Sequence, residues 1–176
     1  MQFVNQRLIT PLSESTTKQL MVGNKILLSG KIYCGRDAVL PRICALVQEG
    51  KLSDYGIDLR GSVIFHSAVS AAGLGPTSSN KLEIENSMSE LSAAGVKLHL
   101  GKGSISPETV RLLNDNNSVF AVIPPITALL TENVISKKVI AFPELGMEAF
   151  YELEVKDYPA VIAVAHQKSI YNKEPI

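Results

Sequence analysis

The sequence of 176 residues contains only two cysteines, no tryptophan and no excess of charge of either sign. Two cysteines, Cys34 and Cys44, cannot by themselves ligate a structural zinc ion or an iron–sulfur cluster. A secreted disulfide scaffold would also need more of them. The 17 basic residues balance the 17 acidic residues, which argues against a nucleic-acid partner.

Long hydrophobic runs are absent as well. No apolar stretch approaches the roughly 20 residues that a membrane span needs. The first residues have neither the basic start nor the apolar core of a signal peptide. We therefore expect one soluble, cytoplasmic domain over residues 1–176, with both cysteines present as reduced thiols.

Apolar runs that alternate with amphipathic segments predict an α/β layer fold. Gly30 predicts a bend within the first strand. Strands are expected at residues 26–34, 62–68, 96–100, 119–123, 134–142, 151–155 and 160–165, and helices at 37–46, at 80–94 and from 106 onward. The residues expected to cap these helices are Asp37, Asn80 (with Glu83) and Ser106 (before Pro107).

Three glycine-containing turns each follow an expected strand, which is where open α/β sheets bind ligands. Each turn carries or adjoins a basic side chain. The turns are Gly35–Asp37 with Arg36, Gly73–Ser79 with Lys81, and Gly101–Ser104 with Lys102.

Neither common nucleotide motif fits these turns. Ser78 occupies the third glycine position of a dinucleotide fingerprint, and Gly103 follows Lys102 where a phosphate loop needs Ser or Thr. A small-anion site remains, with hydroxyl and N–H groups of residues 77–79 at a helix N-terminus. An ordinary alternative exists for each basic residue: a solvated lysine, or an ion pair between Arg36 and Asp37.

The histidines His66, His99 and His166 lack the spacing of metal ligands. Two of them, His66 and His99, lie within apolar strands, where a hydrogen-bonded core histidine is the expected role. The carboxylates Glu144, Glu148, Glu152 and Glu154 are expected to be solvated or structural.

Five motifs occur in an order that identifies a resemblance. They are Val22–Ile32, Gly35–Ala38, Gly75–Ser79, Gly101–Gly103, and Pro143–Ala149 followed by Leu153–Ala160. The last is the most specific. Together they resemble the β subunit, or the C-terminal domain of fused forms, of class I iron–sulfur-dependent fumarate hydratases and L-tartrate dehydratases.

The resemblance implies a fold, a reaction and a partner. The fold is the swivelling β/β/α domain, with three layers and a mixed, partly parallel sheet. The reaction is the reversible hydration of fumarate to L-malate, or the dehydration of a related hydroxy-diacid such as tartrate. An α subunit would carry a [4Fe–4S] cluster, with none bound by this chain alone, and an α2β2 assembly is expected.

The resemblance also assigns roles to four residues. Thr77 matches the threonine that acts as the base for the C3 proton of malate. Arg36, Lys81 and Lys102 match the cations that hold substrate carboxylates, and Lys102 counts with Thr77 as catalytic.

Four positions depart from the family pattern. They are Leu40 in place of a histidine, Ser67–Ala68 in place of Gly-Pro, Lys81 in place of an arginine, and Ala165–Lys168 in place of an aspartate-rich turn. Two alternatives to a fumarate hydratase subunit therefore stay open. In the first, the chain is a diverged, non-catalytic subunit that binds a dicarboxylate or only its partner. In the second, it is a subunit with an altered substrate, because Leu40 makes a pocket wall more apolar.

Overall fold

The structure, a computed structural model, describes residues 5–70, 73–77, 81–123 and 132–172. Its centre is a closed ring of five strands. In ring order these are β2 (Lys25–Cys34), β3 (Val63–Phe65), β6 (Leu98–Gly101), β7 (Val119–Val122) and β9 (Phe150–Ala165). The first four are parallel, and β9 closes the ring by pairing antiparallel with both β7 and β2. The predicted α/β class with a mixed, partly parallel sheet is thus confirmed.

Further strands extend this sheet outside the ring. They are β1 (Gln6–Ile9), parallel to β2, and β8 (Val134–Ala141) and β10 (Lys168–Ser169), both antiparallel to β9. A separate hairpin is formed by β4 (Ser67–Ser70) and β5 (Gly73–Thr77). Since β9 takes part in both the ring and its extensions, this single strand of 16 residues holds most of the sheet together.

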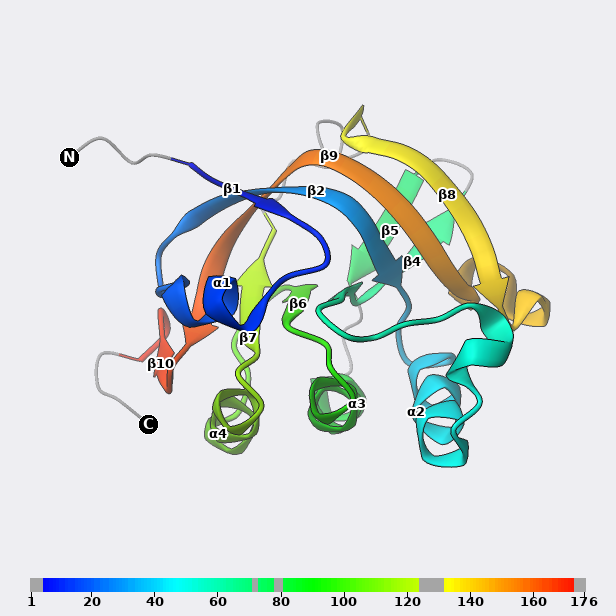
Figure 1. The fold of residues 1–176 in the computed structure, drawn as a ribbon, viewed down its shortest axis with the longest axis horizontal. Helices are drawn as coiled ribbons and strands as arrows, with labels where there is room; N and C mark the ends of the chain where they lie inside the picture. Colours follow the sequence, from blue (N-terminus) through cyan, green and yellow to red (C-terminus); the bar gives the residue numbers. More distant parts are fainter. Residues whose placement is uncertain (1–4, 71–72, 78–80, 124–131, 173–176) are drawn as a thin grey trace.

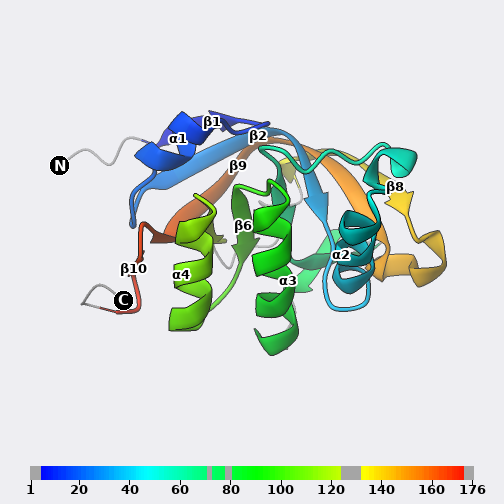
Figure 2. The same cartoon turned by 60° about the horizontal axis from the view of Figure 1, so that its bottom comes forward.

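Three helices cover one side of the molecule: α2 (Leu40–Glu49), α3 (Lys81–Ala93) and α4 (Pro107–Asp115). Figure 1 shows them below, the long strands β2, β8 and β9 arching above, and β6 and β7 between the two. Figure 2 shows α4, α3 and α2 side by side on this face. A short helix, α1 (Glu14–Gln19), and two 3-10 turns, Leu52–Tyr55 and Pro143–Glu148, complete the described elements.

The central strands are apolar because both of their faces are buried. In β3, Val63 and Phe65 point into the ring, whereas Ile64 packs toward α2 and α3. This alternation follows from the two-residue period of a strand. A continuous apolar run is therefore required here, and β7 shows the same pattern, whereas β6 also buries the polar side chain of His99.

Two local predictions are confirmed in detail. At Gly30, φ is +110° and the pairing of β2 with β9 shifts register, so the strand bends there. A Cβ atom at this position would lie 2.4 Å from Oγ1 of Thr10, which leaves room only for glycine. Ser106 caps α4, because its Oγ accepts a hydrogen bond from Thr109 N at 3.2 Å.

Other predictions need correction. The helix expected from Asp37 begins at Leu40 with Val39 as an N-cap that makes no side-chain hydrogen bond. The strand expected at 62–68 is interrupted at His66. The strands expected at 151–155 and 160–165 form one strand, because the pairing with β2 passes over a bulge around Asp157 (φ +49°) instead of ending there.

The elements β1 and α1 were not predicted, and Asn80 lies outside the described residues. In the described ranges, no helix combines the length and the apolar character that crossing a bilayer requires.

Candidate functional site

The carboxyl ends of three parallel strands meet at one level of the ring. Cys34 at the end of β2 pairs with Phe65 of β3, and Phe65 pairs with Leu100 of β6. Arg36 and Lys102 each follow two residues beyond these positions. Because neighbouring strands lie about 4.8 Å apart, the two backbones leave the sheet roughly 10 Å from each other. The first and third predicted turns therefore share one edge, which we call the carboxyl edge.

The predicted threonine reaches the same edge by a different route. Ser67 also lies two residues beyond Phe65, and it pairs with Thr77 in the β4–β5 hairpin. The backbone of Thr77 therefore lies beside Ser67, whose strand follows β3 between the strands that lead to Arg36 and Lys102. Lys81 is the first residue of α3, which follows this hairpin. The side chains of Thr77 and Lys81, and all of Ser78 and Ser79, lie outside the described residues.

Arg36 is held by a residue far away in the sequence. Its Nε donates to Oε1 of Glu148 at 2.5 Å, across a separation of 112 residues. The two side chains are 25% and 31% exposed. The turn itself depends on Gly35, whose added Cβ would meet Val39 Cγ1 at 2.7 Å and Phe150 Cδ2 at 3.1 Å. Arg36 thus leaves the sheet from a tightly packed turn and ends in a half-buried ion pair.

Lys102 differs from Arg36 in its surroundings. It is exposed, directly after Gly101 at the end of β6, and among the described residues no carboxylate lies within ion-pair distance of it. Its ammonium is therefore available to an anion that approaches the carboxyl edge.

Two buried histidines lie directly beneath this edge. His66 Nε2 and His99 Nδ1 are 2.9 Å apart, and His99 Nε2 is 2.8 Å from Oγ of Ser92 in α3. Burial lowers the pKa of His66 to about 3, and burial together with the neighbouring His66 lowers the pKa of His99 well below its usual value. Both rings are neutral near pH 7, and the prediction of hydrogen-bonded core histidines is confirmed.

Leu40 does not form the wall of a pocket. It is 1% exposed and packs in the core between the sheet and α2, beside Val39, Ile43 and Phe150. The hypothesis of a more apolar pocket wall was therefore wrong, because a side chain pointing into the core has no surface left for a substrate.

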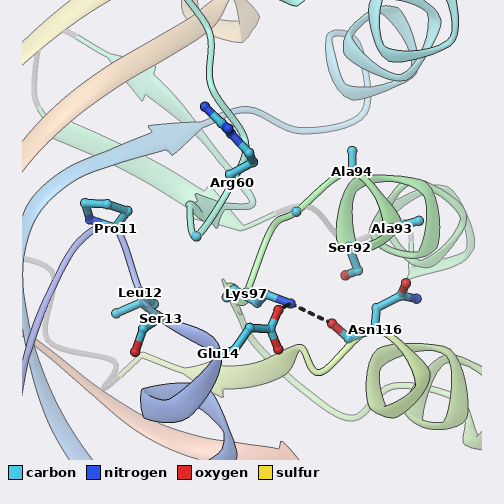
Figure 3. Close-up of a pocket in the computed structure, with 12 residues that line it drawn as sticks. Pro11, Leu12, Ser13, Glu14, Arg60, Ser92, Ala93, Ala94, Lys97 and Asn116 are labelled. Atoms are coloured by element: carbon cyan, nitrogen blue, oxygen red, sulfur yellow. Dashed lines mark hydrogen bonds and ion pairs between the residues drawn. The ribbon is translucent and has the colours of Figure 1, made fainter.

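A cavity of about 680 Å³ lies at the opposite end of the ring, near the amino ends of β3, β6 and β7 (Figure 3). Lys97, 10% exposed, donates to the backbone oxygen of Asn116 at 2.9 Å and pairs with Glu14 at 2.5 Å. The hydrogen bond from Lys97, followed by one from Asn117, lowers the pKa of Glu14. Arg60 points away from this pair and binds Asp58. The charges around the cavity are therefore engaged with one another.

The described residues were compared with the donor sets that metal ions require. They contain no group of three His, Cys, Asp or Glu side chains placed to hold a metal ion. Both cysteines are buried free thiols, and burial raises the pKa of each to about 12.

Glu148 is the residue at this edge that the sequence did not single out. Its carboxylate was expected to be solvated or structural, and the available signal was its position in the Pro143–Ala149 motif. The ion pair with Arg36 joins two motifs that are far apart in the sequence, so local sequence patterns cannot predict it.

Comparisons with known proteins show the family of the chain. The family model described as Fumarase C-terminus matches residues 2–174. A Methanocaldococcus jannaschii protein, provisionally named as the β subunit of an L(+)-tartrate dehydratase, is 29% identical, over 92% of this chain and 89% of its own length. The L(+)-tartrate dehydratase subunit beta of Escherichia coli K12 is 26% identical, over 89% and 81%. The anaerobic class I fumarate hydratase of E. coli K12 is 27% identical over 83% of this chain, which spans only 28% of that enzyme.

Proposed function

Because the chain belongs to the Fumarase C-terminus family, we propose that it is the β subunit of a hydro-lyase that interconverts fumarate and L-malate, or dehydrates a related hydroxy-diacid such as tartrate. The observation that supports the proposal is the register of β2, β3 and β6, which places the turns of Arg36 and Lys102 at one edge, with Thr77 paired to Ser67 just after β3. The relatives named as β subunits, which this chain covers almost end to end, support a separate partner subunit.

A [4Fe–4S] cluster would have to be held by the α partner. In support, the described residues contain no group of three His, Cys, Asp or Glu side chains placed to hold a metal ion. This chain would instead provide the carboxyl edge and close the site against the partner.

The chemistry at the carboxyl edge follows from charge. Removing the C3 proton of malate places a second negative charge beside a carboxylate, and nearby cations stabilise that dianion more than the ground state. Arg36, Lys81 and Lys102 would supply these cations. The Thr77 hydroxyl would take the proton, and because a threonine is a weak base it would depend on those cations and on exclusion of water.

Affinity purification of the chain from its native cells, without oxygen, tests this function. We expect a coloured partner to co-purify and the complex to hydrate fumarate or dehydrate tartrate. A partner that retains its cluster but turns over neither diacid would contradict the proposal. That result would favour the non-catalytic alternative, in which the chain binds a dicarboxylate or only its partner.

A further inference from the structure

The segment Pro143–Glu148 has no role in the function proposed above, although it belongs to the most specific of the sequence motifs. It connects β8 to β9, the strand that closes the ring. Its backbone starts at Phe142 with φ +55° and turns sharply at Gly146, where φ is +59° and ψ is −121°. A non-glycine residue rarely adopts the conformation seen at Phe142, so the surrounding structure holds this turn in place.

Contacts at both ends fix the segment against the rest of the molecule. Near its start, Glu144 accepts a hydrogen bond from Arg42 of α2 at 2.9 Å, and the Arg42 guanidinium lies 5.3 Å from the centre of the Phe142 ring. Farther along, the hydroxyl of Tyr151 donates to Gly146 O at 3.1 Å. Glu148 is therefore presented to Arg36 from a fixed turn.

We propose that Glu148 is a positioning residue for Arg36, which sets the orientation in which Arg36 meets a substrate carboxylate. The inference rests on the function proposed above. A guanidinium is planar and rigid, so a short hydrogen bond at Nε fixes both its plane and the direction of its terminal N–H groups. The half-buried setting makes such a pair stronger than an exposed one.

The charge of Glu148 gives this role a distinctive kinetic signature. Glu148 offsets part of the attraction of Arg36 for an anion, but it fixes the direction of the N–H groups that Arg36 offers to a carboxylate. Without Glu148, the positive charge still attracts a dicarboxylate, but the guanidinium loses the hydrogen bond that fixes its Nε. Loss of the carboxylate should therefore impair the transition state more than ground-state binding, which lowers kcat more than it raises KM.

The experiment compares three variants in the complex assembled with the α partner. We expect Glu148→Ala to lower kcat by about 100-fold while KM changes by less than about threefold. Glu148→Gln keeps a hydrogen-bond acceptor and should recover part of that loss. Glu144→Ala is the matched control, because it removes an ion pair from the same turn to a different arginine, and it should leave kcat within about twofold of the wild type.

A second readout follows Arg36 without turnover. In 1H–15N spectra of the isotope-labelled chain assembled with its α partner, the Arg36 Nε–H resonance, assigned with Arg36→Lys, should be displaced in Glu148→Ala and unchanged in Glu144→Ala. Titration with L-malate should shift it further in the wild type, and more weakly in Glu148→Ala. This measurement separates the two proposals: absence of turnover with an intact L-malate response contradicts only the hydro-lyase function.

Two results would overturn the positioning role. One is a Glu148→Ala complex with wild-type kcat and KM, or with the same defect as Glu144→Ala. The other is an Arg36 resonance that does not respond to L-malate in the wild type, because Arg36 would then hold no dicarboxylate and its pair with Glu148 would be structural only.

Discussion

At the amino ends of the parallel strands Lys97 is buried and engaged by Glu14 and the Asn116 carbonyl, whereas at the carboxyl edge Lys102 is exposed after its strand. Both lysines adjoin β6, on either side of it. One completes the contacts among α1, α3 and α4, and the other faces solvent at the level of Arg36 and Thr77. The difference shows that a charged cavity is not a better candidate ligand site than an open edge when the charges in the cavity already pair with one another.

The largest effect should come from Lys102→Met. If the carboxyl edge stabilises a dianion, loss of this cation should lower kcat of the assembled complex by about 100- to 1,000-fold. Stability should change by less than about 0.5 kcal/mol, since the side chain is exposed. Initial rates of fumarate hydration and urea unfolding of the same preparation measure the two quantities. A variant with full activity would remove Lys102 from the site.

The buried histidines between the two ends should make stability depend on pH. In the unfolded chain their pKa is near 6.5, but in the folded protein His66 binds a proton only near pH 3 and His99 also well below its usual range. Between these values the unfolded state binds more protons, so the free energy of unfolding falls as the pH falls. From pH 7.5 to 5.5 we expect a loss of roughly 1 kcal/mol per histidine, or about 2–3 kcal/mol for the pair.

Urea unfolding at several pH values checks this dependence. His166→Gln is the control, because His166 lies outside the core and bonds only a backbone carbonyl among the described groups, Leu20 O at 2.9 Å. It should retain the full slope. A flat profile in the wild type would mean that the two rings bind protons in the folded protein as they do in the unfolded chain.

The smallest effect should come from Lys97→Met, which tests the amino end. Methionine keeps most of the buried stem but loses the ammonium, so the Asn116 carbonyl loses a donor while Glu14 can turn to water. We expect a destabilisation of about 1–2 kcal/mol by urea unfolding and unchanged kcat and KM in the complex. A marked fall in kcat would make the two ends of the ring functionally equivalent and end the contrast drawn above.

Local chemistry made part of the fold predictable. β2 bends at Gly30, where a Cβ atom has no room, and the hydroxyl of Ser106 caps α4. Both features can be predicted from a few neighbouring residues of the sequence. The turns of Arg36 and Lys102 were also located, because glycine and a basic residue directly follow an apolar strand.

Long-range pairing was not predictable in the same way. The bulge at Asp157 interrupts the apolar pattern, so the sequence predicts two strands. Only the pairing with β2 shows that β9 continues through the bulge. The contact of Arg36 with Glu148 likewise depends on how β9 closes the ring. Leu40 gives the opposite example. It departs from the family pattern close to Arg36 in the sequence, but its side chain lies in the core.

The row of Ser92, His99 and His66 has a consequence for proton order. Each neutral imidazole carries one N–H, so the two hydrogen bonds must run in the same direction. If the Ser92 hydroxyl donates to His99, then His99 donates to His66, and the hydrogen of His66 is on its Nδ1. If the Ser92 hydroxyl accepts, the Nδ1 atom of His66 carries no hydrogen. That Nδ1 atom is buried, with no hydrogen-bond partner in the described structure. The direction in which one hydroxyl on α3 points, beside the amino-end cavity, is therefore coupled to the tautomer of the ring that lies next to the carboxyl edge, and a change of direction requires each ring to exchange its proton between its two nitrogens.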